Sequence, residues 1–289
     1  MQLHSSQPPP IETLMTGLIN EITEITAPCT LVLDDYHVIT EPQVHDAVIF
    51  LLENLPSQMH MIVATRADPP WPLARLRARR EITEVRADDL RFSAVEAAAF
   101  LNDVMGLGLS PEDIAALDSR TEGWIAGLHL AALSMRGKTD VSEFVRAFSG
   151  SHHYILDYLM EEVLGRQPSD VKDFLLSTCI LDRFTAPLCD AVTGRHASQT
   201  ILTTLEQANL FIVPLDDERR WYRYHHLFAD LLRGLLTQTL SDQVLSLHRR
   251  ASEWFEEEGS IEDTISHAFE AKDDERVARL IEKYAEDLL

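Results

Sequence analysis

Two adjacent carboxylates, Asp34 and Asp35, directly follow the run Thr30 to Leu33, in which three of four residues are aliphatic. A short apolar run that stops at polar residues is typical of a strand buried on both faces of a parallel sheet. Ligands of α/β sheets bind beyond the carboxyl ends of the strands, where nucleotide hydrolases hold Mg²⁺ and orient the attacking water. The two acids could instead only cap the turn after the strand, and their spacing alone leaves both interpretations open.

A second apolar run, Met59 to Thr65, predicts a neighbouring strand that stops at Arg66. The residues between the two runs include apolar positions at helical spacing over 44–55, which indicates a strand–helix–strand crossover with parallel strands. Parallel strands end at the same sheet edge, so Arg66 could reach the acids and contact a terminal phosphate. Taken alone, Arg66 is better explained as a surface arginine paired with Asp68. A short third strand is expected at Ile82 to Val85.

A nucleotide site of this kind also requires a glycine-rich loop with Lys and Ser or Thr, whose backbone amides hold the phosphates. The 289 residues contain no GxxxxGK[ST] sequence. The one Gly-Lys-Thr, Gly137 to Thr139, has Ala132 where the first glycine is needed, and it follows a helical pattern instead of a strand. We interpret Gly137 as the end of a helix.

Histidines and cysteines add one further candidate and exclude several chemistries. His225 and His226 stand between a predicted hairpin and the helix after it, where a histidine could face a phosphate or simply fill an interface. The twelve histidines show no HExxH spacing and the three cysteines form no CxxC pair. Metallopeptidases, zinc knuckles and disulfide scaffolds are therefore excluded, and a reducing, cytoplasmic location is expected.

The overall charge bears on possible partners. Asp and Glu total 47 against 25 Lys and Arg, a formal net charge of -22. Direct binding to DNA or RNA is disfavoured, because affinity for a phosphate backbone depends on basic side chains. The basic run Arg75 to Arg80 is followed by Glu81 and Glu84, which predicts a salt-bridged face. No apolar run reaches the roughly 18 residues that cross a bilayer, and the polar first ten residues predict neither a signal peptide nor an anchor.

The elements that must position these residues become helical from Leu90 onward. Ser93 and Glu96 form a capping box, and Ser110-Pro111 is a typical helix start. Between residues 210 and 224 two apolar runs flank a polar turn, which predicts a hairpin and, with its flanking helices, a winged-helix-like unit. The last fifty residues predict two or three helices that resemble the beginning of a repeat array.

Five ordered blocks together resemble the ATPase module of MalT-like, LuxR-family transcription regulators, which belong to the STAND class of signal-transduction ATPases. The resemblance runs from about Thr30 to the C-terminus. In chain order the blocks are Leu31–His37, Ala64–Pro70, Arg86–Ser93, Thr121–Leu128 and Tyr224–Phe228.

The resemblance implies a role for each candidate site residue. Asp34 corresponds to the Walker B acid that serves Mg²⁺, and Asp35 to the acid beside the attacking water. Arg66 corresponds to the sensor of the terminal phosphate, and His225 to the winged-helix histidine that contacts the diphosphate and holds the closed state. Gly123 lies in the block that contacts nucleotide from the helical domain, although Trp-Ile-Ala follows it where other STAND proteins have a proline.

The expected fold is mostly α with a partial α/β portion: an incomplete P-loop-type parallel sheet, a helical domain, a winged helix and the start of a TPR-like array. The expected domain boundaries are residues 1–89, 90–165, 166–240 and 241–289, in that order.

The implied function is a nucleotide-responsive regulatory module that uses ATP or ADP with Mg²⁺. Protein partners or self-association are expected, DNA is expected only through a C-terminal domain that these residues lack, and no membrane is expected. Without the phosphate-binding loop, this polypeptide alone should not hydrolyse ATP usefully, although the family is a slow ATPase switch. The alternative is a nucleotide-independent helical module that binds other proteins.

Overall fold

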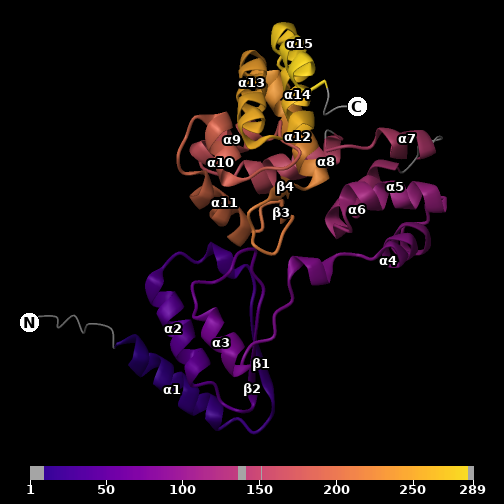
Figure 1. Ribbon diagram of the computed structural model, residues 1–289. Helices are drawn as coiled ribbons and strands as arrows, with labels where there is room; N and C mark the ends of the chain where they lie inside the picture. Colours follow the sequence, from indigo (N-terminus) through magenta and orange to yellow (C-terminus); the bar gives the residue numbers. More distant parts are fainter. Residues whose placement is uncertain (1–9, 136–140, 151, 286–289) are drawn as a thin grey trace, which may run out of the picture. The chain divides into compact units, whose positions relative to one another are not determined.

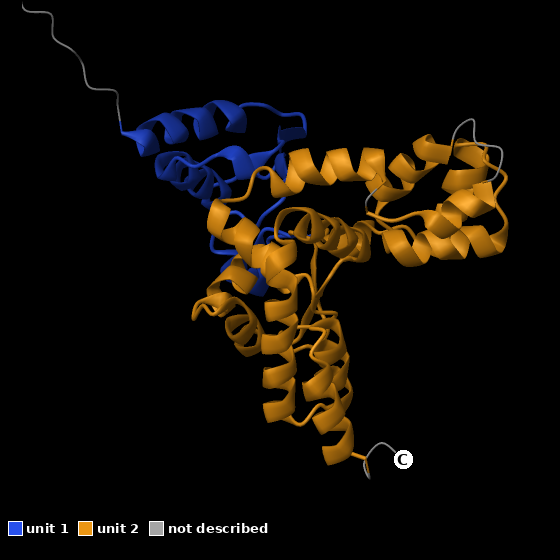
Figure 2. Cartoon of the chain, turned by 90° about the horizontal axis from the view of Figure 1, so that it is seen from above, with its two compact units in different colours: residues 1–84, 207–209 blue, residues 85–206, 210–289 orange. Residues whose placement is uncertain are grey.

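The computed structural model describes residues 10–135, 141–150 and 152–285. These residues form fifteen α-helices and four short strands, so the mostly α prediction is confirmed (Figure 1). The chain divides into two compact units (Figure 2), residues 1–84 with 207–209, and residues 85–206 with 210–289. The four predicted domain boundaries stay a prediction. The Gly137 to Thr139 segment lies outside the described residues.

Unit 1 contains the predicted strand–helix–strand arrangement. Its elements are α1 (Ile11–Thr23), β1 (Cys29–Leu33), a 3-10 turn at Tyr36–Val38, α2 (Pro42–Glu53), β2 (Met59–Val63) and α3 (Leu73–Arg79). The two strands pair in parallel, with Cys29 opposite Met59 and Leu33 opposite Val63. The helix α2 connects them, as a parallel pair requires, and α1 packs against α2.

The strands are not buried on both faces, so that part of the prediction is wrong. Along β1 partly buried residues alternate with exposed ones, and Val32 is 59% exposed. Ile62, its neighbour on β2, is 56% exposed. The alternation shows that the described residues cover one face of this two-stranded sheet and leave the other open. Sequence cannot separate the two faces when both carry aliphatic side chains.

The predicted third strand is also wrong, because Ile82 to Val85 has no regular secondary structure. Instead, Glu84 lies beside α3 and accepts two hydrogen bonds from Arg77, at 2.7 and 2.8 Å. Arg75, two residues earlier on α3, pairs with Glu53 of α2. Two arginines of the basic run are thus paired with glutamates, in agreement with the expected salt-bridged face.

Unit 2 is helical apart from one hairpin. The elements after α3 are a 3-10 turn at Ala87–Leu90, α4 (Ala94–Ala99), a π-helical turn at Phe100–Val104, α5 (Pro111–Thr121), α6 (Ile125–Met135), α7 (Val141–Ala147), α8 (His153–Tyr158), a π-helical turn at Leu159–Leu164, α9 (Ser169–Thr178), α10 (Ala186–Thr193), α11 (Ser198–Gln207), β3 (Ile212–Pro214), β4 (Tyr222–Tyr224), α12 (His226–Thr239), α13 (Ser241–Glu258), α14 (Ile261–Glu270) and α15 (Asp274–Lys283). Ser93 caps α4 through its predicted box with Glu96, and Ser110 caps α5.

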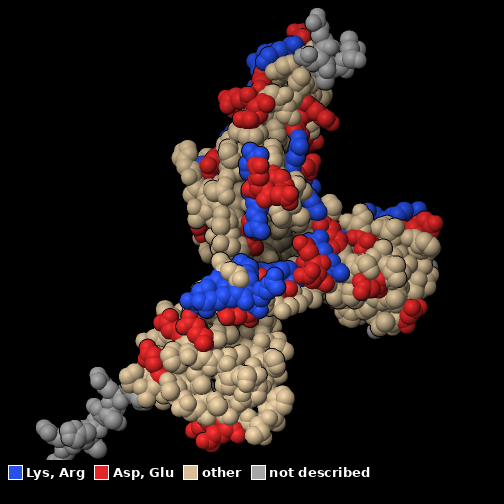
Figure 3. Space-filling view, turned by 60° about the horizontal axis from the view of Figure 1, so that its bottom comes forward, with Lys and Arg blue, Asp and Glu red and all other residues tan. Residues whose placement is uncertain are grey.

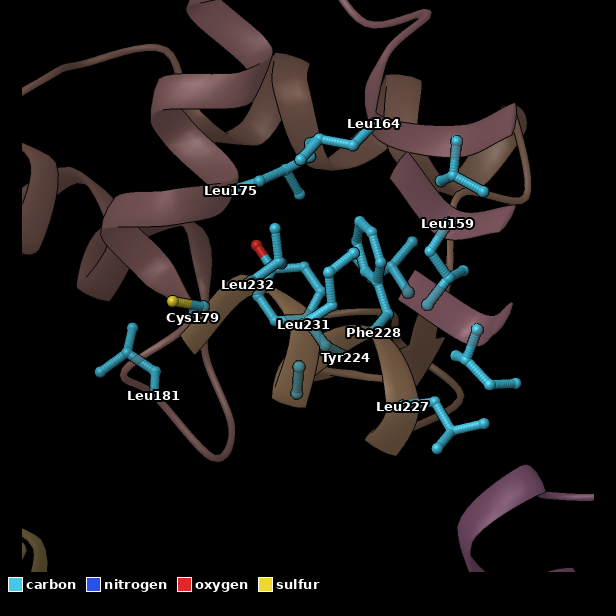
Figure 4. Close-up of a cluster of buried hydrophobic side chains, with 14 of the residues drawn as sticks. Leu159, Leu164, Leu175, Cys179, Leu181, Tyr224, Leu227, Phe228, Leu231 and Leu232 are labelled. Carbon is cyan, nitrogen blue, oxygen red and sulfur yellow. The ribbon is translucent and has the colours of Figure 1, made fainter. Parts of the chain in front are cut away.

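The predicted hairpin is present. β3 and β4 pair antiparallel, with Ile212 opposite Tyr224, and Phe184 adds a bridge to Tyr222 from the segment before α10. The hairpin packs onto the helices that flank it through a core centred on α12. Figure 4 shows Phe228 and other side chains of α12 among leucines of the preceding helices. A fully buried side chain of the size of Phe228 contributes about 3 kcal/mol.

The last three helices follow the winged-helix-like region. α13 and α14 pack against each other along their length (Figure 1), and α15 packs on α14 around Ala268, Val277 and Leu280. Gly259 ends α13 at the predicted break, with a φ of 80°. The TPR-like assignment of these helices stays a prediction. In the described part of the chain, no helix is long and apolar enough to cross a membrane.

Candidate functional site

Asp34 is the first residue after β1 and stands at the carboxyl edge of the sheet. The ladder continues past it, because Ala64 donates to the Leu33 carbonyl at 2.9 Å and Tyr36 donates to the Ala64 carbonyl at 3.0 Å. Asp34 is exposed, and its Oδ1 accepts the Asp35 amide hydrogen at 2.9 Å. The contact expected of a turn cap is therefore present. A carboxylate has further lone pairs, so this contact leaves capacity for Mg²⁺ or water.

Asp35 has an unusual backbone conformation. Its φ of 50° is left-handed, which is uncommon outside glycine and better tolerated by Asp than by most residues. Its side chain is 69% exposed, and Oδ1 lies 3.9 Å from Nδ1 of His37. The conformation turns the chain sharply into the 3-10 turn and presents the carboxylate to solvent at the sheet edge.

A buried cluster below the two acids holds this turn. The Tyr36 side chain is 1% exposed, and its hydroxyl lies 2.9 Å from Nδ1 of His45 on α2. Trp71 donates its indole hydrogen to the same hydroxyl at 3.1 Å, which leaves the hydroxyl proton available to His45. Burial raises the pKa of Tyr36, which keeps the hydroxyl protonated as this arrangement requires. Sequence reasoning assigned no role to this cluster.

Arg66 lies three residues beyond β2, at the same sheet edge as the acids. The register that pairs Leu33 with Val63 brings the segments after both strands to this edge. Arg66 is exposed. Its contact with a terminal phosphate stays a prediction, as do the roles of Asp34 and Asp35. The described residues contain no group of three metal-ligating side chains, so Mg²⁺ held by Asp34 would take its other ligands from water and phosphate.

Gly123 lies in unit 2, in the turn between α5 and α6, and the backbone there requires glycine. Its φ is 71°, and a Cβ would lie 2.5 Å from the Phe92 carbonyl oxygen. The Gly123 carbonyl also accepts the Phe92 amide hydrogen at 2.9 Å. Packing therefore accounts for this glycine without a ligand, and its nucleotide contact stays a prediction.

His225 is buried against the same turn. It is 4% exposed, and its Nε2 lies 3.0 Å from the Thr121 carbonyl oxygen. Because a carbonyl only accepts, Nε2 carries the hydrogen, and the buried Nδ1 then has no hydrogen-bond partner among the described residues. The rings of Trp124 and Phe211 meet the imidazole edge-on, at 6.0 and 5.5 Å between centroids. Burial is the main cause that lowers the pKa of His225, so the ring is neutral at pH 7.

Glu122 joins the turn to β4 and α12. Its side chain is 8% exposed, and its two oxygens accept hydrogen bonds of 2.8 Å each from Nη1 and Nη2 of Arg223. Oε1 also accepts the His226 amide hydrogen at 3.1 Å. Burial by itself raises the pKa of Glu122, but these hydrogen bonds and the charge of Arg223 together lower it to about 2.

The structure thus brings Gly123 and His225 together in unit 2, while the acids and Arg66 belong to unit 1. Sequence reasoning missed Glu122 and Arg223, which lock the turn to the hairpin. A glutamate inside the Thr-Glu-Gly-Trp block was the one available signal. Its partner lies 101 residues away along the chain, which no local pattern reveals.

Comparison with known proteins finds a family model that covers the hairpin and α12 but not the 121–123 turn. The family model described as the MalT winged helix domain matches residues 160–244. The chain is 37% identical over 270 residues to the serine/threonine-protein kinase PknK of Mycobacterium tuberculosis, a match that covers 93% of the chain and 24% of PknK.

Two proteins with the name HTH-type transcriptional regulator MalT are also similar. The Cronobacter sakazakii protein is 32% identical over 265 residues, 91% of the chain and 29% of the relative. The Vibrio cholerae protein is 29% identical over 276 residues, 95% of the chain and 31% of the relative. The chain spans less than a third of the length of each relative. The expected resemblance is confirmed: the chain is MalT-like, and its residues 160–244 match the model of the MalT winged helix domain.

Proposed function

We propose that the chain is a nucleotide-responsive regulatory module of a LuxR- or MalT-type, ATP-dependent transcription activator. The names of its relatives support a shared module, because the same region occurs in a kinase and in HTH-type regulators. A region that both share does not account for a kinase activity or a DNA-binding activity that only one of them has in its name. We therefore infer that the shared region is a switch. A cytoplasmic location and protein partners or self-association belong to the same proposal.

The observation that carries the proposal is the buried Nδ1 atom of His225 without a partner. An unsatisfied buried polar atom costs about 1–3 kcal/mol, so a ligand that satisfies it gains that amount. In the neutral ring Nδ1 can only accept. To donate to a phosphate oxygen, His225 must take up a proton or release the Thr121 carbonyl and change tautomer. Diphosphate binding is therefore coupled either to proton uptake or to loosening of the Thr121 contact.

In unit 1, the same proposal assigns Asp34 to Mg²⁺, Asp35 to the attacking water and Arg66 to the terminal phosphate. ATP or ADP with Mg²⁺ would supply the cation for the two carboxylates and the phosphate for the arginine. The chain's own residues hold the acids at the strand edge through the turn at Asp35 and the cluster around Tyr36. They hold His225 against the 121–123 turn through Glu122.

Hydrogen exchange with and without millimolar Mg-ADP tests the proposal. We expect ADP to change amide exchange at residues 121–124 and 225–228, and His225→Ala to abolish the change. His196→Ala is the matched control, because His196 is exposed and has no hydrogen bond or ion pair in the described part of the chain. Identical exchange with and without nucleotide in the wild-type chain would contradict the proposal.

The alternative is a nucleotide-independent helical module that binds proteins. Sedimentation of the chain with ADP, with ATP and without nucleotide separates the two functions. A regulatory module should change its association state with nucleotide, and Asp34→Ala or His225→Ala should alter that response. A simple interaction module should sediment identically in all three conditions, and both variants should behave like the wild type.

A further inference from the structure

A pocket of about 560 Å³ lies in unit 2 between α12, α13, α14 and the segment that follows α9. Its volume is in the range of small-molecule sites, which combine apolar walls with a few convergent polar groups. The walls include four apolar side chains: Ile180, Leu236, Val244 and Phe255. The proposed nucleotide function uses none of these residues.

Two histidines line the pocket and bond to each other. Nδ1 of His248 on α13 lies 2.9 Å from Nδ1 of His267 on α14, so one ring donates and the other accepts. The ring that donates through Nδ1 has a bare Nε2, and the other ring carries its hydrogen on Nε2. Burial lowers the pKa of both rings, that of His248 to about 4, so the pair is neutral at pH 7. In the described residues neither Nε2 has a partner, and the pair offers one donor and one acceptor.

Charges of both signs surround this neutral centre. Arg233 donates to Asp182 at 2.7 Å, and Arg183 donates to Asp263 at 3.0 Å. Each guanidinium has five N–H donors, so both retain donors for a ligand. Glu270 adds a third carboxylate, exposed and without an ion pair in the described part of the chain. A ligand of one sign would meet unfavourable charges here, whereas a ligand with both signs can place each against its opposite.

We propose that this pocket binds a small zwitterion with an apolar body, the class of free amino acids and dipeptides. The ligand carboxylate bonds to Arg183 and Arg233, and the ammonium lies at Glu270 and Asp263. The apolar body packs on the wall formed by Leu236, Val244 and Phe255. In a dipeptide, the uncharged peptide group between the two ends bonds to the free Nε2 atoms of the histidine pair.

Such a ligand would tie the winged-helix region to the first helices after it. Arg233 belongs to α12, Arg183 to the segment before α10, and Glu270 to α14. A bound zwitterion therefore bridges elements on both sides of the junction between α12 and α13. Its effect does not require nucleotide, and its failure would leave the proposed function untouched.

Titration calorimetry of the 289-residue chain with the dipeptide leucyl-leucine tests the proposal. Two blocked forms keep the apolar body and remove one charge each: N-acetyl-leucyl-leucine lacks the ammonium and leucyl-leucinamide lacks the carboxylate. We expect leucyl-leucine to bind and each blocked form to bind at least about tenfold more weakly. A tenfold change in the dissociation constant corresponds to roughly 1.4 kcal/mol of binding free energy.

Two variants assign each charge to its side chain. Glu270→Gln should weaken binding of leucyl-leucine and leave N-acetyl-leucyl-leucine unaffected, whereas Arg183→Gln should weaken leucyl-leucine and leave leucyl-leucinamide unaffected. Glu253→Gln is the control, since Glu253 is exposed on α13 and does not line the pocket. Thermal unfolding of each variant checks that the fold is intact.

Three outcomes would overturn the proposal. The first is that leucyl-leucine shows no binding at about 10 mM, which means a binding free energy weaker than roughly 3 kcal/mol. The second is that the three compounds bind equally well, which shows that the two charges of the ligand do not contribute to binding. The third is that the two pocket variants match the Glu253→Gln control, which places the binding elsewhere.

Discussion

Single residues in the 121–123 turn show how local backbone and distant packing combine. Gly123 has a left-handed φ of 71° and a Cβ there would meet the Phe92 carbonyl, whereas Gly106 has a similar φ of 69° and a Cβ there would meet nothing within 4 Å. Comparing the two glycines therefore separates the free-energy cost of a left-handed backbone from the cost of the contact with Phe92. The position of Gly123 could be guessed from its motif, but the contact with Phe92 could not.

Alanine at these two glycines should therefore have different effects. Gly106→Ala should cost about 1 kcal/mol of unfolding free energy, the usual penalty of a left-handed alanine. Gly123→Ala should cost about 3 kcal/mol, because the backbone at Phe92 must also shift. Urea denaturation of both variants measures the difference. Equal losses would show that the Phe92 contact is not tight in solution.

A second prediction concerns Glu122 and the pH dependence of the free energy of unfolding. Its folded pKa of about 2 lies below the ordinary 4.5, so its contribution is present above pH 4.5 and is lost as the pH falls toward 2. The shift corresponds to a stabilisation on the order of 3 kcal/mol. Glu122→Gln should lower stability at pH 7 by about 2 kcal/mol, since Arg223 loses its charged partner.

Denaturation at pH 7 and at pH 3 checks both effects. The gap between wild type and Glu122→Gln should shrink at the lower pH. Glu257→Gln, at an exposed position on α13, should stay within about 0.5 kcal/mol of wild type at both values. A gap that stays constant with pH would mean that the loss comes from packing and not from the charge.

At the scale of elements, the sequence predicts most of the helices and both strand pairs, because their signals are local. The apolar runs at β1 and β2, the hairpin around residue 216 and the capping box at Ser93 each need only a few neighbouring residues. The errors arise where the signal is not local. Ile82 to Val85 alternates like a strand but finds no strand to pair with among the described residues. The acids and Arg66 follow strands that end at one edge, which could be predicted because parallel pairing follows from the crossover.

The pairing of α13 with α14 includes a contact that the sequence did not reveal, the bond between His248 and His267. Burial is the main cause that lowers the pKa of both rings, that of His248 to about 4. As the pH falls, these two histidines therefore take up protons at a higher pH in the unfolded chain than in the folded chain. The stability that the neutral pair contributes is present above pH 6.5 and is lost as the pH falls from 6.5 toward 4.

Other charges near the pair set the size of this effect. Asp182, Asp263 and Glu270 favour a protonated ring, whereas Arg233 opposes it. We expect His248→Gln to flatten the fall in stability between pH 6.5 and 4, with thermal unfolding as the measurement. His196→Gln, at an exposed position, should retain the wild-type slope. A slope that survives in His248→Gln would assign the proton uptake to other groups.

At the scale of the whole molecule, charge is distributed unevenly. The net charge is -22, yet the Lys and Arg residues of positions 10–84 all lie between Arg66 and Arg80. Figure 3 shows one large group of basic side chains and several smaller ones in the face in view, with acidic side chains scattered among them. In unit 1, the described positive charge is confined to Arg66 and the basic run, in which Arg75 and Arg77 are paired with glutamates.

This distribution leads to the last prediction, that the 289-residue chain alone does not hydrolyse ATP usefully. Hydrolysis requires a group that holds the β- and γ-phosphates, normally the loop lysine and its backbone amides, and the sequence contains no such loop. Arg66 could offset only part of that charge. Phosphate release with Mg-ATP should therefore equal that of Asp34→Ala. Tight, Mg²⁺-dependent binding of labelled ATP in a filter assay, with turnover that Asp34→Ala abolishes, would contradict this and would require other groups in the chain to hold the phosphates.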